Sequence, residues 1–401
     1  MRLLYLQQLL VLPGCAGNNR CWQFARQWRD AGHEVTFVSS DAYLPDDHPL
    51  KVKKGGVLHT ELEGIELILL PVRYDHLMSF QRRVGSFLEF FRQAKRLIRK
   101  LNPADYDAVL AYSAPLSVGE LGRWAAARMG KPLFFEVADV WPEVPIGMGI
   151  VRSKRMKHWL NHRTDAVYAA AQRVFPYSEG MAELIMARGV PAAKLLPIPN
   201  GADLASIEFV PRSSELHNPV EFIYTGTIGV ANDLTQLMWA MHEVEQQHRA
   251  DIRLTVVGQG NDARRVQALA RRLDLRQVIF QPPVSREAAT RLLDQADVGI
   301  VCFAPYPVLE ANSATKFFDY LAAGLPILTN YQGWQARYLN QYRCGMAAPQ
   351  DNLMALAQNI LFLANSAERR AEFSRAGRQL AEDHFDRRKL AQEMLMGMLS
   401  A

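Results

Sequence analysis

The sequence is poor in cysteine, with four in 401 residues: Cys15, Cys21, Cys302 and Cys344. No two of them form a CxxC pair, so their spacing favours isolated thiols in a reducing compartment over a disulfide framework or a zinc site. No stretch approaches 18 consecutive apolar residues, which argues against a membrane-spanning helix. The opening residues 1–14 lack the small-residue cleavage site of a signal peptide, and we interpret them as a strand followed by a loop.

A strong excess of one charge is also lacking. Lys and Arg number 46 against 41 Asp and Glu, which gives a net charge of +5. The basic stretches have no interleaved aromatic platform outside an apolar helix face, so we expect no nucleic-acid partner. The composition, 49% hydrophobic and 22% charged, is typical of a globular protein, and the length suits two domains.

Short apolar runs alternate with helical patterns along the whole chain. This βα alternation predicts an α/β protein with mostly parallel sheets and helices on both faces. The expected strands cover residues 2–7, 34–40, 65–72, 107–113, 132–137, 173–178, 220–226, 253–258, 278–283, 298–303 and 326–330.

The rhythm changes in a polar, aperiodic stretch, which we interpret as a linker over residues 195–218. It separates two doubly wound, Rossmann-like domains, expected at residues 1–194 and 219–384. We expect the last helix, about residues 385–401, to pack back on the first domain. Ligands bind beyond the carboxyl ends of strands in such sheets, and two facing sheets would form a cleft lined by these loops.

Residues 312–328, which predict a loop followed by a helix, place a cation at a position where positive charge is electrostatically unfavourable. Asn312 and Ser313 are typical of a helix start, with Ser313 expected to cap it, so Lys316 falls in the first turn. A helix N-terminus with a lysine in its first turn suits an anion, above all a phosphate. Asp319 follows one turn later and could accept hydrogen bonds from a ribose diol. The alternative is a plain Lys–Asp pair on a solvated face.

Two further loops contain glycines directly after predicted strands. Residues 12–19 include Gly14 and Gly17, and residues 224–229 include the hydroxyl of Thr227. Glycine allows the backbone to approach a phosphate closely, although turn geometry alone explains either loop equally well.

Acidic side chains occur in two other places. Residues 135–144, at the end of a predicted strand, contain Asp139 and Glu143, which could serve a site or merely start a helix. Asp105 and Asp107 resemble a metal-binding DxD pair, but they precede a strand and so lie at the opposite edge of the sheet. We therefore expect no metal site.

Together these stretches resemble the retaining glycosyltransferases of family four, which have the GT-B fold. The resemblance rests on residues 25–40 and 198–204, "ARQWRDAGHEVTFVSS" and "IPNGADL", and covers nearly the whole chain. "FEVADVWPE" and "NSATKFFDYLAAGLPIL" are similar to bacterial transferases that build O-antigens, capsules and exopolysaccharides, including the N-acetylfucosamine transferases. The implied fold is two Rossmann-like domains facing across a cleft, of which the first, residues 1–194, would bind the acceptor and the second, residues 219–384, the nucleotide sugar.

The resemblance implies transfer of a hexosyl or N-acetylhexosaminyl group, with retention, from a nucleotide-diphosphate donor such as a UDP-sugar. The acceptor would be lipid-linked or a saccharide in surface polysaccharide synthesis. It also implies a cytoplasmic protein, peripheral at the inner face of the membrane, without cofactor or metal. Two alternatives remain open: a nucleotide-sugar 2-epimerase on the same fold, and a non-catalytic partner subunit.

The family's E-x7-E motif is incomplete in this sequence. Asp319 occupies the position of its second glutamate, but Ala311 stands at the first, with Glu310 one residue out of register. The expected catalytic residues are Asp139 and Lys316. The expected donor-binding residues are Gly14, Gly17, Thr227, Arg264, Asn312, Ser313, Ala314, Thr315, Lys316 and Asp319. The expected sugar or acceptor residues are Asp139, Glu143 and Glu310.

Residues 80–101 predict a basic amphipathic helix. Its apolar positions are Val84, Phe87, Leu88, Phe91, Ile98 and Leu101, and its cations include Arg92, Lys95, Arg96 and Arg99. The pattern fits a core-facing helix with a solvated basic face, and equally a helix that meets an anionic membrane surface. A second basic stretch, residues 151–163, could extend the same face.

Overall fold

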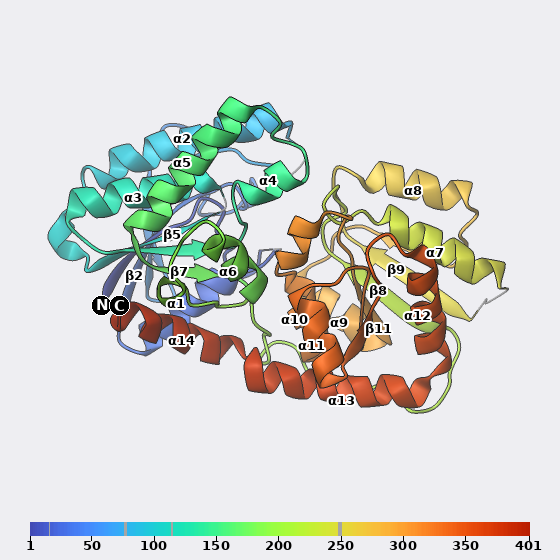
Figure 1. Cartoon of the computed structure of the whole chain (residues 1–401). Helices are drawn as coiled ribbons and strands as arrows, with labels where there is room; N and C mark the ends of the chain where they lie inside the picture. Colours follow the sequence, from blue (N-terminus) through green and yellow to red (C-terminus); the bar gives the residue numbers. More distant parts are fainter. Residues whose placement is uncertain (16, 76–77, 114, 248–250) are drawn as a thin grey trace. The chain divides into compact units, whose positions relative to one another are not determined.

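The computed structural model describes residues 1–15, 17–75, 78–113, 115–247 and 251–401 (Figure 1). Ala16, in the predicted glycine loop, lies outside the described residues. The chain forms two compact units: residues 1–199 with 388–401, here called the first domain, and residues 200–387, the second domain. The division falls inside the predicted linker and close to the start of the predicted last helix.

The first domain is built on a seven-stranded sheet with strand order β3-β4-β2-β1-β5-β6-β7. Neighbouring strands are parallel except β3 and β4, which form an antiparallel edge pair. The strands are β1 (Arg2–Leu6), β2 (Glu34–Ser40), β3 (Leu58–Leu62), β4 (Ile65–Leu70), β5 (Ala108–Tyr112), β6 (Leu133–Val137) and β7 (Ala171–Pro176). The helices are α1 (Arg20–Asp30), α2 (Phe80–Ile98), α3 (Leu116–Met129), α4 (Glu143–Gly147), α5 (Lys154–Ala170), α6 (Glu179–Met186) and α14 (Arg387–Leu399), with 3-10 turns η1 (Pro103–Asp105) and η2 (Ala192–Lys194).

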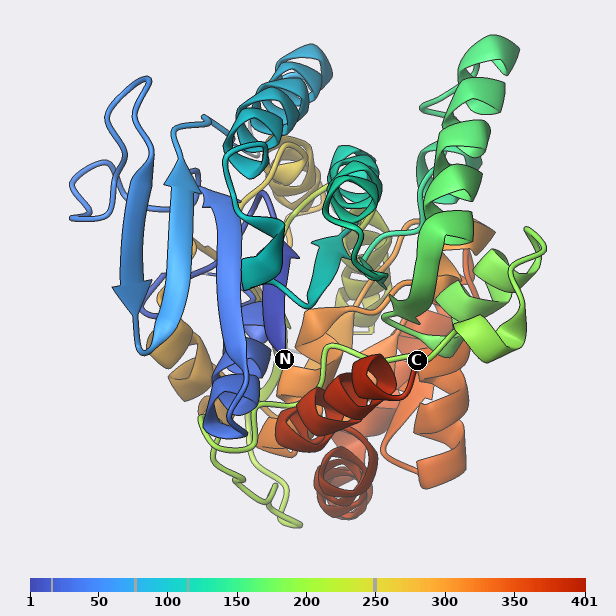
Figure 2. The ribbon, with the colours of Figure 1, turned by 90° about the vertical axis from the view of Figure 1, so that its left-hand side faces the viewer.

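Helices cover both faces of this sheet. Helices α2, α3 and α5 lie side by side on one face, and α1 and α14 lie on the other (Figure 2). Trp28 of α1 donates from Nε1 to the carbonyl oxygen of Ala391 at 2.8 Å, and Met394 is fully buried in the same apolar cluster. The C-terminal helix is therefore part of the core of the first domain.

The second domain has a six-stranded sheet of order β10-β9-β8-β11-β12-β13, in which every neighbouring pair is parallel. The strands are β8 (Val220–Thr225), β9 (Ile252–Val257), β10 (Val278–Gln281), β11 (Val298–Val301), β12 (Ile327–Thr329) and β13 (Gly345–Ala347). The helices are α7 (Thr235–Gln246), α8 (Ala263–Arg272), α9 (Arg286–Gln295), α10 (Thr315–Ala323), α11 (Trp334–Tyr342), α12 (Leu353–Asn365) and α13 (Ala367–His384), with η3 (Pro307–Ala311). Helix α7 packs against α8 and α12, and α10 packs against α9 and α13. The two largely parallel sheets confirm the predicted fold class.

Helix α2 buries a face that differs from the predicted apolar stripe. Phe90 and Ala94, which are outside the predicted stripe, are fully buried, whereas Val84 and Leu88 of the stripe are 37% and 47% exposed; of the stripe, Ile98 alone is fully buried. Most of the predicted stripe therefore lies outside the core, because the sheet contacts the helix through a neighbouring row of side chains. Among the described residues, no helix is both long and apolar enough to cross a membrane.

Candidate active site

Each sheet reverses its strand order at one point, and there two loops diverge to opposite faces. In the first domain this switch point lies between β1 and β5, and in the second between β8 and β11. Ligands of open α/β sheets bind beyond the carboxyl ends of the strands at such points. The glycine loop after β1 and the loop that leads into α10 both start there.

The start of α10 differs from the prediction. The helix begins at Thr315 with Ala314 as its N-cap, and Ser313 makes no capping hydrogen bond, so its predicted role as the cap is wrong. The loop is held by its carbonyl groups: Asn200 Nδ2 donates to Ser313 O at 2.8 Å and Trp334 Nε1 to Asn312 O at 2.9 Å. Ser313 Oγ and Asn312 Oδ1 are buried and have no hydrogen-bond partner among the described residues. Two polar atoms thus remain for a ligand at this helix end.

Lys316 lies in the first turn of α10, as predicted, and is half-buried. Its ammonium stacks on the Tyr224 ring, 4.4 Å from the centroid, and donates to the Tyr224 hydroxyl at 3.3 Å. Tyr224 in turn donates to the carbonyl oxygen of Thr227 at 2.7 Å. Burial lowers the pKa of Lys316 to about 8, against the opposing effects of Cys302 and Asp319. Burial removes much of the hydration of this ammonium group and so disfavours its charged form. An anion bound at the helix end would stabilise that charged form.

The glycine loops beside Lys316 are packed backbone to backbone. A Cβ atom on Gly258 would approach the carbonyl oxygen of Gly226 to 1.9 Å, and one on Gly260 would approach that of Ile228 to 2.2 Å. The two loops can therefore pack this closely only because residues 258 and 260, in the loop after β9, are glycines. Thr227, at the tip of the first of these loops, is exposed, as its predicted ligand role requires.

Asp319 lies one turn beyond Lys316, but its ion-pair partner is Arg286, with 3.7 Å between Oδ1 and Nη2. Arg286 is also paired with the buried Asp203 at 3.1 Å. Burial raises the pKa of Asp319, and Arg286 opposes that shift. Asp319 Oδ1 accepts no hydrogen bond from any described residue. Asp319, the residue predicted to bind ribose, therefore lies beside an arginine, and its Oδ1 can still accept a hydrogen bond from a ligand.

The other predicted donor and sugar residues of the second domain have separate surroundings. Arg264 is exposed in the first turn of α8, while its neighbour Arg265 forms ion pairs with Asp262 and Asp233 at 2.7 and 3.0 Å. Glu310 lies in η3, where its Oε1 accepts from the backbone N–H of residue 332 at 3.4 Å.

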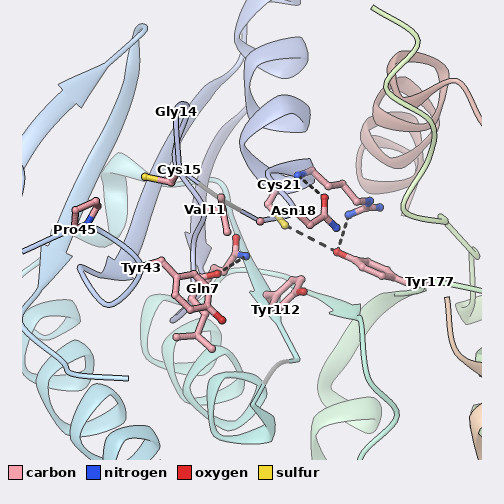
Figure 3. A pocket seen from close by; sticks show the side chains of 13 residues that line it. Gln7, Val11, Gly14, Cys15, Asn18, Cys21, Tyr43, Pro45, Tyr112 and Tyr177 are labelled. Atoms are coloured by element: carbon pink, nitrogen blue, oxygen red, sulfur yellow. Dashed lines mark hydrogen bonds between the residues drawn. The ribbon is translucent and has the colours of Figure 1, made fainter. Parts of the chain in front are cut away.

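The first domain contains a cavity of about 520 Å³ at its switch point, here called the first-domain cavity. Its lining comes from the β1–α1 loop and from the ends of three strands, and includes Gln7, Cys15, Tyr43, Tyr112 and Tyr177. Figure 3 shows these side chains around it. Apart from the loop glycines, no sequence pattern marks this set, because its members are spread over 170 residues and meet only through the sheet order.

The predicted phosphate-binding glycines line this cavity. Gly14 and Gly17 have φ of +80° and +129°, a region that favours glycine, and a Cβ at Gly17 would meet Val11 Cγ2 at 3.0 Å. Their backbone therefore forms a wall of the first-domain cavity.

A buried network of charged and polar groups supports the cavity. Glu136 of β6 is fully buried and pairs with Arg20, which is 1% exposed. Tyr5 and Tyr177 also donate hydroxyl hydrogen bonds to Glu136. The sequence offered one signal for this network, a carboxylate inside the apolar run of residues 132–137, and sequence reasoning missed it.

The predicted acids after β6 have different surroundings. Asp139 is exposed and its backbone contacts Ser113 Oγ. Burial is the main cause of the raised pKa of Tyr112, and the charge of Asp139 adds a smaller contribution. Glu143 forms an ion pair with Arg188, and its Oε2 is buried without a hydrogen-bond partner among the described residues. In the described part of the chain, no group of three or more His, Cys, Asp or Glu side chains could hold a metal ion.

Two family models match the chain, one on each domain. Residues 16–201 match a "glycosyl transferase 4-like domain" and residues 206–380 match "glycosyl transferases group 1". No curated protein sequence matches at a significant level.

Solved structures with the same architecture span the whole chain. Sucrose-phosphate synthase from Thermosynechococcus elongatus has a TM-score of 0.75 and 16% identity, covering 100% of this chain and 98% of that one. Anabaena HepE, in complex with UDP-glucose, has a TM-score of 0.70 and 15% identity, covering 100% of both chains. WaaG, a glycosyltransferase involved in lipopolysaccharide biosynthesis, has a TM-score of 0.68 and 16% identity, covering 98% of both. At these identities the likeness shows the fold, which is GT-B.

Proposed function

We propose that this chain, whose domains belong to the glycosyl transferase 4-like and glycosyl transferases group 1 families, transfers a sugar from a UDP-sugar to a saccharide or lipid-linked acceptor. The proposal includes retention of configuration, a hexosyl or N-acetylhexosaminyl donor and a role in bacterial surface polysaccharide synthesis. The bound UDP-glucose of the neighbour HepE is consistent with the choice of donor.

The observation that carries this proposal is the position of Lys316. A partly desolvated ammonium group lies at the start of a helix, beside two glycine loops that pack backbone to backbone. The barrier to glycosyl transfer lies in expelling a nucleoside diphosphate, and fixed positive charge and N–H dipoles stabilise that leaving group. Lys316 and the α10 N-terminus would serve this purpose without a metal ion.

The other residues of the second domain then have distinct tasks. Asp319, fixed by Arg286, would accept a hydrogen bond from the ribose, and Ser313 and Asn312 would bind phosphate or ribose oxygens. In the first domain, Asp139 would orient the acceptor. Retention would follow if the acceptor hydroxyl entered on the face from which the diphosphate leaves, and no enzymatic nucleophile is needed.

The function is tested by supplying nucleotide sugars with and without acceptor saccharides. A UDP-sugar that stabilises the protein in a thermal-shift screen should be consumed in proportion to a saccharide product, with the anomeric configuration of the donor preserved. Saturation at a hundredfold over Kd adds about 2.7 kcal/mol of stability, which such a screen detects. Conversion of the donor to an epimer without acceptor would contradict transfer, and binding without any turnover would favour the partner-subunit alternative.

The lowered pKa of Lys316 predicts that donor binding weakens in alkaline solution. Because the free protein loses this charge as the pH rises through about 8, affinity for UDP should fall up to tenfold per pH unit above that value. The loss is not unfolding: a lysine with a depressed folded pKa binds fewer protons folded than unfolded between the two pKa values, so stability rises over that window. Calorimetric titration with UDP from pH 6.5 to 9.5 measures the effect. A matched series with Lys316→Arg should stay flat, and an equally steep fall there would exclude Lys316 as the titrating group.

The first domain also presents a surface suited to a membrane. On α2, the exposed Val84 and Leu88 lie on the same helix as the exposed cations Arg92 and Arg96. Lys95 is partly withdrawn, with its ammonium 4.8 Å from the Trp124 ring, and Arg99 lies over the same ring at 5.8 Å. Helix α5 adds Met156 and Trp159, exposed by 48% and 55%. We include peripheral attachment to an anionic membrane, at its cytoplasmic face, in the proposal.

Charge reversal tests this attachment. Changing Arg92 and Arg96 to Glu should lower binding to anionic vesicles more than tenfold, since each cation near such a surface contributes about 1 kcal/mol. The control is Arg271→Glu with Arg291→Glu, which alters the net charge equally at exposed positions of the second domain. Co-sedimentation that ignores vesicle charge, or falls equally in the control, would show α2 to be ordinary surface.

A further inference from the structure

Among the described residues that line the first-domain cavity, one side chain is charged, and its charge is already paired. Arg20 is its one ionisable cation, and all three guanidinium nitrogens have partners: Nη1 contacts Glu136 and the Tyr177 hydroxyl, Nη2 donates to Ile198 O, and Nε donates to Pro199 O. In the part of the chain that the structure describes, no Asp, Glu or Lys side chain lines the cavity. Burial also raises the pKa values of the two lining thiols, to about 12 for Cys21, and so keeps them neutral.

One described polar side chain of the cavity is left unsatisfied. Gln7, directly after β1, is 4% exposed, and its Oε1 has no hydrogen-bond partner among the described residues. Its Nε2 makes one long bond, 3.4 Å to Leu9 O. Figure 3 shows the amide at the cavity, near the rings of Tyr43 and Tyr112. An unpaired buried carbonyl has lost its hydrogen bond to water, and a ligand hydroxyl or N–H group would restore that bond.

Aromatic rings supply most of the remaining chemistry. Tyr112 and Tyr177 meet edge to face with 6.2 Å between their centroids, and Tyr43 lines the cavity from the loop after β2. Flat apolar faces, combined with a few fixed hydrogen-bonding groups, suit the C–H faces and hydroxyls of a sugar ring. A carboxylate or phosphate would lose its hydration here without gaining a cation.

We propose that the first-domain cavity binds an uncharged sugar residue of the acceptor, with Gln7 Oε1 accepting a hydrogen bond from one of its hydroxyl or acetamido N–H groups. This inference rests on the proposed function and specifies its acceptor. Hexoses, deoxyhexoses and N-acetylhexosamines fit the cavity chemistry, whereas uronic acids and sugar phosphates do not.

Cys15 provides a readout that does not depend on transfer. It lines the cavity and is partly exposed, whereas Cys21, Cys302 and Cys344 are buried. Alkylation of Cys15 by iodoacetamide in the full-length protein can be followed by peptide mass spectrometry. Methyl glycosides of hexoses and N-acetylhexosamines should slow it at least fivefold at saturation, and methyl glucuronide and glucose 6-phosphate should not. UDP alone should leave the rate unchanged.

Two neighbouring glutamines offer a matched pair of variants. Gln8 is as buried as Gln7 and also has an unpartnered Oε1, but its amide donates to Ser86 Oγ of α2 at 3.1 Å. Gln7→Leu should raise the saccharide concentration needed for half-protection about tenfold. Gln8→Leu should leave it unchanged, and UDP-induced thermal stabilisation should persist in both.

The wild-type panel decides the outcome even if Gln7→Leu does not fold. Protection by charged sugars as strong as by neutral ones would overturn the inference, as would protection by UDP alone or by no saccharide. Protection confined to neutral sugars supports it. If that selectivity is seen but no donor is consumed, the proposed transfer fails while the neutral-sugar site stands, so the two failures are distinguishable.

Discussion

Lys316→Ala is expected to lower kcat by about two orders of magnitude while the protein stays folded. Removing one preorganised donor from a developing oxyanion typically costs a factor of 10²–10³, and Lys316 is the cation placed at the α10 N-terminus. The melting temperature should not fall, because the variant also removes a desolvated charge whose pKa is already depressed. Turnover with saturating donor and acceptor, together with a thermal melt, measures both effects.

Two companion variants separate charge from packing. Lys316→Met keeps the aliphatic stem over Tyr224 but has no charge, so its turnover should be as low as that of the alanine variant. Tyr224→Phe keeps the ring and removes only the hydroxyl that accepts from Lys316, so it should lose less than tenfold. A fully active Lys316→Met enzyme would show that the stem, not the ammonium, matters.

The interior of both sheets could be predicted because parallel strands are buried on both faces and so appear as apolar runs. Two edge strands were missed for physical reasons. β3 (Leu58–Leu62) alternates polar and apolar residues beside the antiparallel β4, and β13 (Gly345–Ala347) is too short to form a run. Neither has the signal of a central strand.

The candidate site was predictable only where one local segment defines it. Residues 312–328 placed Lys316 at a helix start by turn chemistry alone, although the helix begins later than Ser313 suggested. Its partner Tyr224 lies 92 positions away in sequence and meets it through the order of β8 and β11. Gln7 gave no sequence signal either, because its unpaired oxygen is a property of the folded cavity.

Glu136→Leu is expected to destabilise the first domain by about 3–5 kcal/mol, the largest effect on stability among these variants. The carboxylate is fully buried in β6 and is the counter-charge of Arg20, which is itself 1% exposed. Its removal leaves a guanidinium group in the interior with two carbonyl groups and a phenol as partners, none of them charged. For a domain of this size the melting temperature should fall by about 10 °C.

The physical cause is tested by removing the cation as well. Glu136→Leu combined with Arg20→Met leaves no uncompensated charge, so the double variant should recover most of the lost stability, as apolar replacements of buried ion pairs commonly do. Glu120→Gln is the matched control: this buried carboxylate of α3 pairs with Arg123 and Arg163, whose side chains are 39% and 40% exposed and can rehydrate. Its cost should therefore stay near 1 kcal/mol.

A double variant less stable than Glu136→Leu alone would mean that the network stabilises the fold through packing and hydrogen bonds rather than through charge compensation.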